Sequence, residues 1–141
     1  MRPHHTPASR GQAIAEFALA IPIFLLLVFG LLDIGRLVYI NNAIAQGARE
    51  AARWGSVQGR SGTAAGRASI AAYARASMAA VPTPTVTVSC VDGAGTTVSD
   101  CGSNDILVVR VSSPVAMFTP VIGQLVGPLT TATTSQVVVN Q

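Results

Sequence analysis

The sequence has no lysine, few histidines and little charge of either sign. Charged residues make up 11% of the 141 residues, whereas soluble domains contain about 25%. All nine basic residues are arginine, and six acids bring the net charge to +3. Arg2 and Arg10 supply two of the positive charges, so the chain beyond Arg10 carries only 7 − 6 = +1. Because a nucleic-acid-binding surface needs clustered positive charge, we expect no nucleic-acid partner.

The patterns that carry catalysis or metal binding are also missing. The sequence contains no G-x4-GK[ST] phosphate loop, no HExxH, no G-x-S-x-G and no D-x-S-x-S metal motif. Both histidines, His4 and His5, lie in the first five residues, so no Ser/His/Asp or Cys/His arrangement can form in the rest of the chain. The acids of that part are scattered. We therefore expect neither an enzyme nor a metal site, and no cofactor.

What the sequence does contain is one long apolar run. Residues 17–32 are sixteen positions without a charge, between Glu16 and Asp33. A membrane-spanning helix needs about 20 residues to cross a hydrocarbon core about 30 Å thick. Adding residues 13–15 and 34–40 supplies that length, and no second stretch is comparably hydrophobic. The run predicts a single membrane-spanning helix in contact with the lipid bilayer.

The residues before the run predict its orientation. Residues 1–11 form a short basic leader with Arg2, Arg10 and the starting amine, and the positive-inside rule places such a segment in the cytoplasm. Arg36, Arg49 and Arg53 follow the span and weaken the asymmetry. We expect everything after Asp33 to lie outside the cytoplasm.

The two cysteines point to the same compartment. Cys90 and Cys101 are spaced C-x10-C across a loop rich in Gly, Ser and Asp. An even pair that closes a short loop favours a disulfide in an oxidising compartment, with two free thiols as the alternative. A secretory signal peptide is an alternative for the N-terminus. It would be cleaved at the small-x-small site of residues 43–45 and release a domain that starts near Gln46. That site lies about eleven residues beyond the apolar run, which is far for a cleavage region.

Glu16, at the head of the apolar run, needs an explanation, because a carboxylate inside a membrane costs several kcal/mol unless it is paired or interfacial. One explanation is a helix cap, since the helix dipole favours an acid at the N-terminus. The other lies in the local string, in which Gly11 is followed five residues later by Glu16, then by Phe17 and the hydrophobic helix. This string, directly after a basic leader, resembles a type IV prepilin processing site.

Residues 10–57 as a whole resemble the TadE-like family, the pseudopilins of tight-adherence (Tad/Flp) pilus systems. The matching pieces are the G-x4-EF start, Pro22 inside the run, the polar close at residues 33–36 and the alanine-rich string at residues 48–53. The resemblance implies that a prepilin peptidase cuts between Gly11 and Gln12 in the bacterial inner membrane. It also implies other pilins or pseudopilins and an inner-membrane assembly platform as partners.

The resemblance further implies a role for Glu16, the fifth residue of the cleaved chain, together with Phe17 in subunit recognition. Cleavage removes Arg2 and Arg10 and creates an ammonium group at Gln12, which can neutralise a carboxylate at apolar depth, in its own chain or a neighbour's. The expected function is that of a minor pilin or pseudopilin. The alternative is an uncleaved single-span anchor whose outer domain scaffolds another envelope complex; a major pilin is disfavoured because those subunits are far shorter.

Two features concern the helix itself. Pro22 removes a backbone donor and predicts a kink that neighbouring helices compensate. Small residues recur every four positions after the span and form one face on which another helix can approach closely: Ala43, Gly47, Ala51 and Gly55. That face suits a neighbouring subunit or the chain's own domain equally well.

The remaining chain predicts a small α+β domain. Four glycines predict a flexible link over residues 55–66, and apolar residues at helical spacing predict a second helix over 64–80. Alternating valines predict strands at residues 85–91, 106–112 and 131–139. Residues 114–129 are apolar but broken by prolines and glycines, which predicts a loop or short helix over the sheet or an exposed patch.

The predicted fold class is therefore α+β and pilin-like: a long transmembrane helix followed by a second helix and a three-stranded antiparallel sheet. The expected organisation is a cytoplasmic leader at 1–11, a membrane and assembly helix at 12–54, a link at 55–66 and an extracytoplasmic domain at 67–141.

Overall fold

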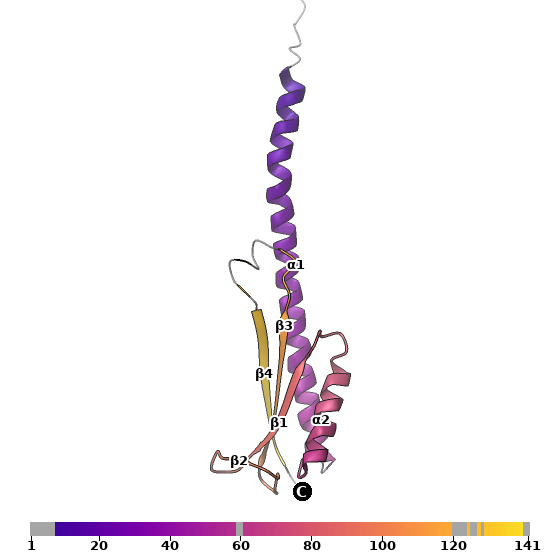
Figure 1. Ribbon diagram of the computed structural model, residues 1–141, viewed down its shortest axis with the longest axis vertical. Helices are drawn as coiled ribbons and strands as arrows, with labels where there is room; N and C mark the ends of the chain where they lie inside the picture. Colours follow the sequence, from indigo (N-terminus) through magenta and orange to yellow (C-terminus); the bar gives the residue numbers. More distant parts are fainter. Residues whose placement is uncertain (1–7, 59–60, 120–123, 125–126, 128, 140–141) are drawn as a thin grey trace, which may run out of the picture.

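The computed structural model describes residues 8–58, 61–119, 124, 127 and 129–139. Within these residues the chain forms two helices and one antiparallel sheet (Figure 1). The elements follow in the order α1 (Ala8–Val57), α2 (Ala64–Ser77), β1 (Thr85–Val91), β2 (Thr97–Val98), β3 (Ile106–Val115) and β4 (Leu129–Val138). The architecture is the α+β arrangement that the sequence predicts, with a long apolar N-terminal helix.

Helix α1 is 50 residues long and consists of two unlike halves. At a rise of about 1.5 Å per residue it extends over about 75 Å. Residues 11–32 are exposed apart from half-buried Gly30, and they project as a free rod (Figure 1). From Asp33 onward the side chains at helical spacing are buried, beginning with Ile40, Ile44 and Ala48. The helix is continuous through Pro22, and the kink predicted there stays a prediction.

The sheet has four strands in the order β2-β1-β3-β4, one more than predicted. All neighbours are antiparallel. The additional strand, β2, is a pair of residues that returns after the turn at Asp92 and lies opposite Cys90 and Val91. Two residues are too few to produce an alternating pattern, so this strand could not be predicted from the sequence.

One face of the sheet forms the core with both helices. Val86, Val109 and Val111 lie on this face and are buried, whereas Arg110 points to the opposite, exposed face. This agrees with the alternation in the sequence, because residues two apart along a strand share a face. Helix α1 packs on β3 and β4, and α2 packs beside α1 and on β1 (Figure 1).

The boundaries of the second helix and of the link differ from those predicted. Helix α2 begins after Thr63, whose Oγ1 accepts the N–H of Gly66 at 3.0 Å. It ends at Ser77 and not at residue 80, because Met78 leaves helical geometry and its carbonyl accepts the N–H of Val81 in a turn. The connection between the helices is also shorter than residues 55–66, since α1 continues to Val57.

Strands β3 and β4 also end differently from the prediction. Strand β3 continues past Ser112 to Val115, and β4 runs from Leu129 to Val138. Pro114 lies beyond the last residue that β1 pairs, so its missing N–H costs no bond on that side of the ladder. The apolar segment at 114–129 is therefore partly strand, and most of its middle lies outside the described residues.

Candidate membrane and assembly site

The free half of α1 carries large apolar side chains that are exposed in the described part of the chain. Phe17 is 66% exposed, and Leu19, Ile23 and Phe24 are also exposed. Among the described residues, α1 is the one helix that is both long enough and apolar enough to cross a membrane. In water such a surface would be strongly unfavourable, so it requires lipid or other apolar helices around it. The helix is a candidate membrane span.

The predicted processing site lies on this exposed half. Gln12 Nε2 donates a hydrogen bond to Glu16 Oε1 at 3.0 Å, so these two side chains share one face of the helix. A side chain built at Gly11 would meet nothing within 4 Å, so the helix surface at this position is uncovered. Glu16 lies two turns inside α1, which begins at Ala8, so it does not cap the uncut helix. Of the two explanations for Glu16, the cap is wrong for the uncleaved chain.

A contact that the sequence did not predict marks the point where the free rod ends. The two carboxylate oxygens of Asp33 accept the backbone N–H groups of Phe118 and Thr119, at 2.8 and 3.0 Å. Asp33 is only 3% exposed. The guanidinium of Arg36 lies 4.8 Å from the ring centroid of Phe118, a cation–π contact. We call these four residues the Asp33 clasp; they join the end of the β3 segment to the middle of α1.

The small-residue face of α1 packs inside the chain's own domain. A Cβ at Gly47 would overlap Met78, the residue that follows α2, and one at Gly55 would come within 2.6 Å of Ile70 and 2.9 Å of Leu107. Ala51 is fully buried and Ala43 half-buried. The sequence left open whether this face meets a subunit or the domain, and the structure places it against α2 and β3.

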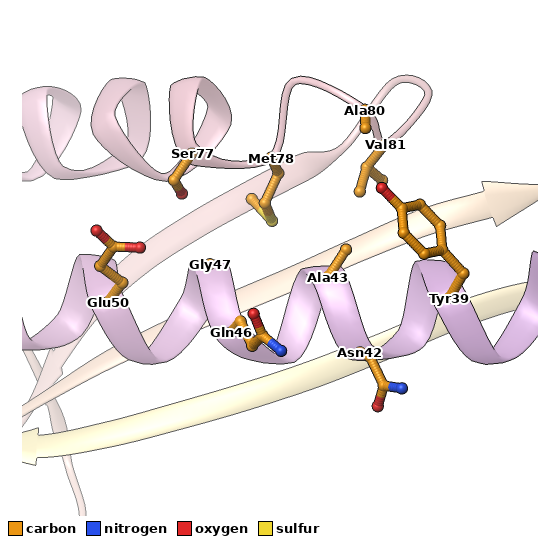
Figure 2. Close-up of a pocket in the computed structure, with 10 residues that line it drawn as sticks. All are labelled: Tyr39, Asn42, Ala43, Gln46, Gly47, Glu50, Ser77, Met78, Ala80 and Val81. Carbon is orange, nitrogen blue, oxygen red and sulfur yellow. The ribbon is translucent and has the colours of Figure 1, made fainter.

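A groove of about 330 Å³ lies where α1 passes the end of α2 (Figure 2). Met78 points across it toward Gly47, and Glu50 is the charged residue that lines it. The Glu50 carboxylate accepts the hydroxyl of Tyr73 at 2.8 Å, so it is part of the contact between the helices. That hydrogen bond, with burial and the repulsion of the nearby negative charge, raises the pKa of Tyr73 above its ordinary value.

The remaining predicted residues are structural. Cys90 and Cys101 form a disulfide, with 5.4 Å between their Cα atoms, and both are buried. It joins β1 to the segment after β2. In the part of the chain that the structure describes, no three His, Cys, Asp or Glu side chains gather to hold a metal ion.

The geometry defines a class: a small α+β domain carried on a helix whose first half is exposed, apolar and long enough to span a membrane. This is the architecture of a membrane-anchored, pilin-like protein. The family model described as TadE-like protein matches residues 11–53 of this chain. The resemblance to the TadE-like family is therefore confirmed over that segment, which contains Gly11, Glu16, Pro22 and Asp33.

Comparison with curated proteins and comparison with solved structures gave no match. The family match associates the chain with components of a Tad pilus. It ends inside the packed half of α1, so α2 and the sheet lie outside it.

Proposed function

We propose that this chain is a minor pilin or pseudopilin of a Tad/Flp-type pilus, processed by prepilin peptidase after Gly11 and assembled through the free half of α1. The observation that carries the proposal is the position of the Gly11–Glu16 site. It lies on the exposed, apolar half of the helix and at the start of the segment that matches the TadE-like family. The role proposed is structural and not catalytic.

Cleavage after Gly11 would change the electrostatics of the helix end. In the uncut chain α1 starts at Ala8, so the N–H groups of the next turn bond to carbonyls of residues 8–11. Removing those residues frees these N–H groups and adds an ammonium at Gln12, and both place positive charge at the new helix end. Glu16 is one turn away on the face of Gln12, where this charge is strongest.

The same arrangement gives Glu16 a role in assembly. Its carboxylate is exposed in the single chain, where Gln12 donates to it. When apolar rods pack side by side, the carboxylate loses water and requires a positive partner. The ammonium of a neighbouring subunit supplies that partner only if the two helices have the correct stagger. Glu16 would therefore select the register between subunits.

The experiment that tests the proposal is the N-terminal residue of the protein purified from membranes, by intact mass with terminal sequencing. We expect a start at Gln12. A start at Met1 would contradict processing and leave an uncleaved single-span scaffold. A start near Gln46 would contradict the membrane anchor altogether and indicate a secreted domain.

A first variant addresses recognition by the peptidase. Gly11→Asp adds a charged side chain at a point where the open backbone would meet the enzyme, and we expect the leader to remain on the full population of molecules. The matched control is Gly93→Asp, the same change at an open glycine in the turn between β1 and β2. Intact mass distinguishes the cut from the uncut chain. Normal processing of Gly11→Asp would count against the site.

A second variant separates cleavage from assembly. Glu16→Val should leave processing and membrane insertion intact but remove the partner of the neighbour's ammonium. Breaking a desolvated ion pair costs about 3–5 kcal/mol, so we expect piliation to fall about tenfold or more. Sheared pili quantified by blotting give the measurement, and Glu16→Gln shows how much of the effect is charge. Unchanged piliation in Glu16→Val would mean that the glutamate has no part in assembly.

A further inference from the structure

The Asp33 clasp lies at the level where α1 passes from free rod to packed helix. Leu32 is the last residue of the uncharged run, and Asp33 follows it directly. β3 runs along the packed half of α1, and residues 116–119 bring its end to Asp33 (Figure 1). The segment at residues 116–119 and the end of the candidate membrane span therefore lie at the same height along α1.

The length of the uncharged run is short for a bilayer. Sixteen residues at about 1.5 Å each cover about 24 Å, whereas the hydrocarbon core is about 30 Å thick. Part of the span must therefore come from residues beyond the run. Glu16 at one end has an exposed carboxylate, but Asp33 at the other end is withdrawn from water and both of its oxygens are satisfied by N–H groups. Moving the Asp33 end of the run into the interfacial layer of the bilayer therefore costs less desolvation free energy than moving the Glu16 end there.

The side chains that face outward at this level suit that layer. Phe118 is 67% exposed although its backbone is held against α1, and Ile34 and Tyr39 in the same stretch of the helix are also exposed. Arg36 stacks on the Phe118 ring, which leaves a cation at the edge of an aromatic surface. Tyrosine is enriched where hydrocarbon meets headgroups, phenylalanine occupies the apolar face of interfacial segments, and arginine extends its charged end toward the interface.

We propose that the Asp33 clasp is a membrane-seating collar. Phe118 enters the boundary between the acyl chains and headgroups of the outer leaflet, and Arg36 lies at the phosphate level. The Asp33 carboxylate holds the loop in place, so the collar sets the depth and tilt of the domain on the bilayer. The collar depends on the membrane span of α1 in the proposed function, but not on cleavage after Gly11.

The test measures depth in the bilayer with a single tryptophan. The native Trp54 is replaced by phenylalanine, which can still stack on Tyr73, and Phe118→Trp is introduced in the full chain. The chain is reconstituted into phosphatidylcholine vesicles whose lipids carry bromine, a fluorescence quencher, either near the headgroup or near the bilayer centre. Two companion variants in the same background calibrate depth: Phe24→Trp in the free half of α1 and Thr97→Trp in β2, at the far end of the domain.

We expect Phe118→Trp to be quenched by shallow bromine, Phe24→Trp by deep bromine and Thr97→Trp by neither. Quenching of Phe118→Trp no stronger than that of Thr97→Trp would overturn the collar. A blue-shifted emission of Phe118→Trp without quenching at either depth would also overturn it, because a second copy of the chain would then cover the ring. An unquenched Phe24→Trp would remove the span and the collar together.

The clasp itself has a matched control within the domain. Asp33→Asn replaces a carboxylate that accepts two backbone N–H groups, one on each oxygen. Asp92 also accepts two backbone N–H groups, those of Ala94 and Thr96 in the turn before β2, but with Oδ1 alone, so an asparagine there can keep both bonds. In the Phe118→Trp background we expect Asp33→Asn to lose most of the shallow quenching and Asp92→Asn to keep it. Unchanged quenching in Asp33→Asn would show that the clasp does not seat the loop.

The collar and the proposed function can fail separately. Shallow quenching of Phe118→Trp in a chain that keeps Met1 would support the collar and contradict pilin processing. A chain that starts at Gln12 but shows no quenching of Phe118→Trp would keep the proposed function and overturn the collar.

Discussion

At the scale of single residues, two glycines decide how closely α1 and the domain approach. Gly47 faces Met78, and Gly55 faces Ile70 and Leu107, both of which are fully buried. In each case the space of a Cβ is already occupied by a side chain of another element. The helix carries glycine at these positions because of the close approach, although glycine is a weak helix former.

Gly55→Ala should therefore destabilise the domain. The added methyl overlaps buried Ile70 and Leu107, and overpacking of this kind costs about 1–3 kcal/mol, offset by about 1 kcal/mol of helix propensity. We expect a net loss of free energy of unfolding of about 1 kcal/mol. The measurement is urea unfolding of the full chain in detergent, followed by circular dichroism. The control is Gly35→Ala, where nothing lies within 4 Å; equal stability of the two variants would contradict the packing argument.

At the scale of elements, the contacts between the two helices include an aromatic and a polar one. The rings of Trp54 and Tyr73 are stacked with centroids 4.8 Å apart. The Tyr73 hydroxyl donates to Glu50 at 2.8 Å. Removing only the hydroxyl separates the polar contact from the stacking.

Tyr73→Phe should lower the free energy of unfolding modestly, and this loss should become smaller at alkaline pH. The hydrogen bond to Glu50, burial and charge repulsion raise the pKa of Tyr73 in the folded chain. A raised pKa means that folding favours the neutral hydroxyl, so the contribution is complete below the unfolded pKa of about 10 and is lost as pH rises through the folded value.

The measurement is the difference in unfolding midpoint between the native chain and Tyr73→Phe from neutral to alkaline pH. The difference should be constant up to about pH 10 and should shrink above it. Tyr39→Phe, at an exposed tyrosine, serves as the control for general alkaline effects. A difference that stays constant through the alkaline range would show that the hydroxyl contributes nothing through Glu50.

The elements were predictable to the extent that their pattern is local. Strand β1 matches its predicted bounds, because Val86 and Cys90 alternate with polar residues along a half-buried strand. For β3 the prediction ended at Ser112, because two serines and a proline resemble a turn. In the structure Ser113 is buried and its hydroxyl donates to the carbonyl of Pro82, so tertiary contacts keep the strand extended.

In the candidate site, too, the residues that are close in sequence were predictable and the long-range contacts were not. Gly11, Glu16 and Pro22 lie within one short segment, so the processing site could be suggested from their resemblance to a prepilin site between a basic leader and an apolar run. The Asp33 clasp joins residues 85 and 86 positions apart, through backbone N–H groups that have no sequence signature. The sequence analysis used Asp33 only as the end of the apolar run, and nothing in the sequence identified Phe118 and Thr119 as its partners.

At the scale of the whole molecule, the chain is a rod joined to a domain, and its orientation decides which half meets which compartment. The leader carries Arg2, Arg10 and the starting amine, and Arg36, Arg49 and Arg53 are the first arginines after the span. Arg36, the nearest of these, is held on Phe118 by its cation–π contact. The folded domain with its disulfide requires an oxidising compartment to form that bond.

These features predict that the leader stays in the cytoplasm and the domain lies outside. The test uses single added cysteines, since both native cysteines are in the disulfide: Ser9→Cys in the leader and Ala72→Cys on the exposed side of α2. Gly11→Asp is included so that the leader is retained. In intact spheroplasts we expect a membrane-impermeant maleimide to label Ala72→Cys, and to label Ser9→Cys only after permeabilisation.

The reverse labelling pattern would mean that the arginines after the span outweigh those of the leader. Labelling of both positions only after permeabilisation would place the domain in the cytoplasm, where a disulfide is not maintained. The reverse pattern would also place Gly11 outside the cytoplasm and contradict the proposed processing at the cytoplasmic end of the span, whereas the second pattern would contradict the membrane span itself. The membrane span, the disulfide and the proposed cleavage site therefore all require the same orientation of the chain.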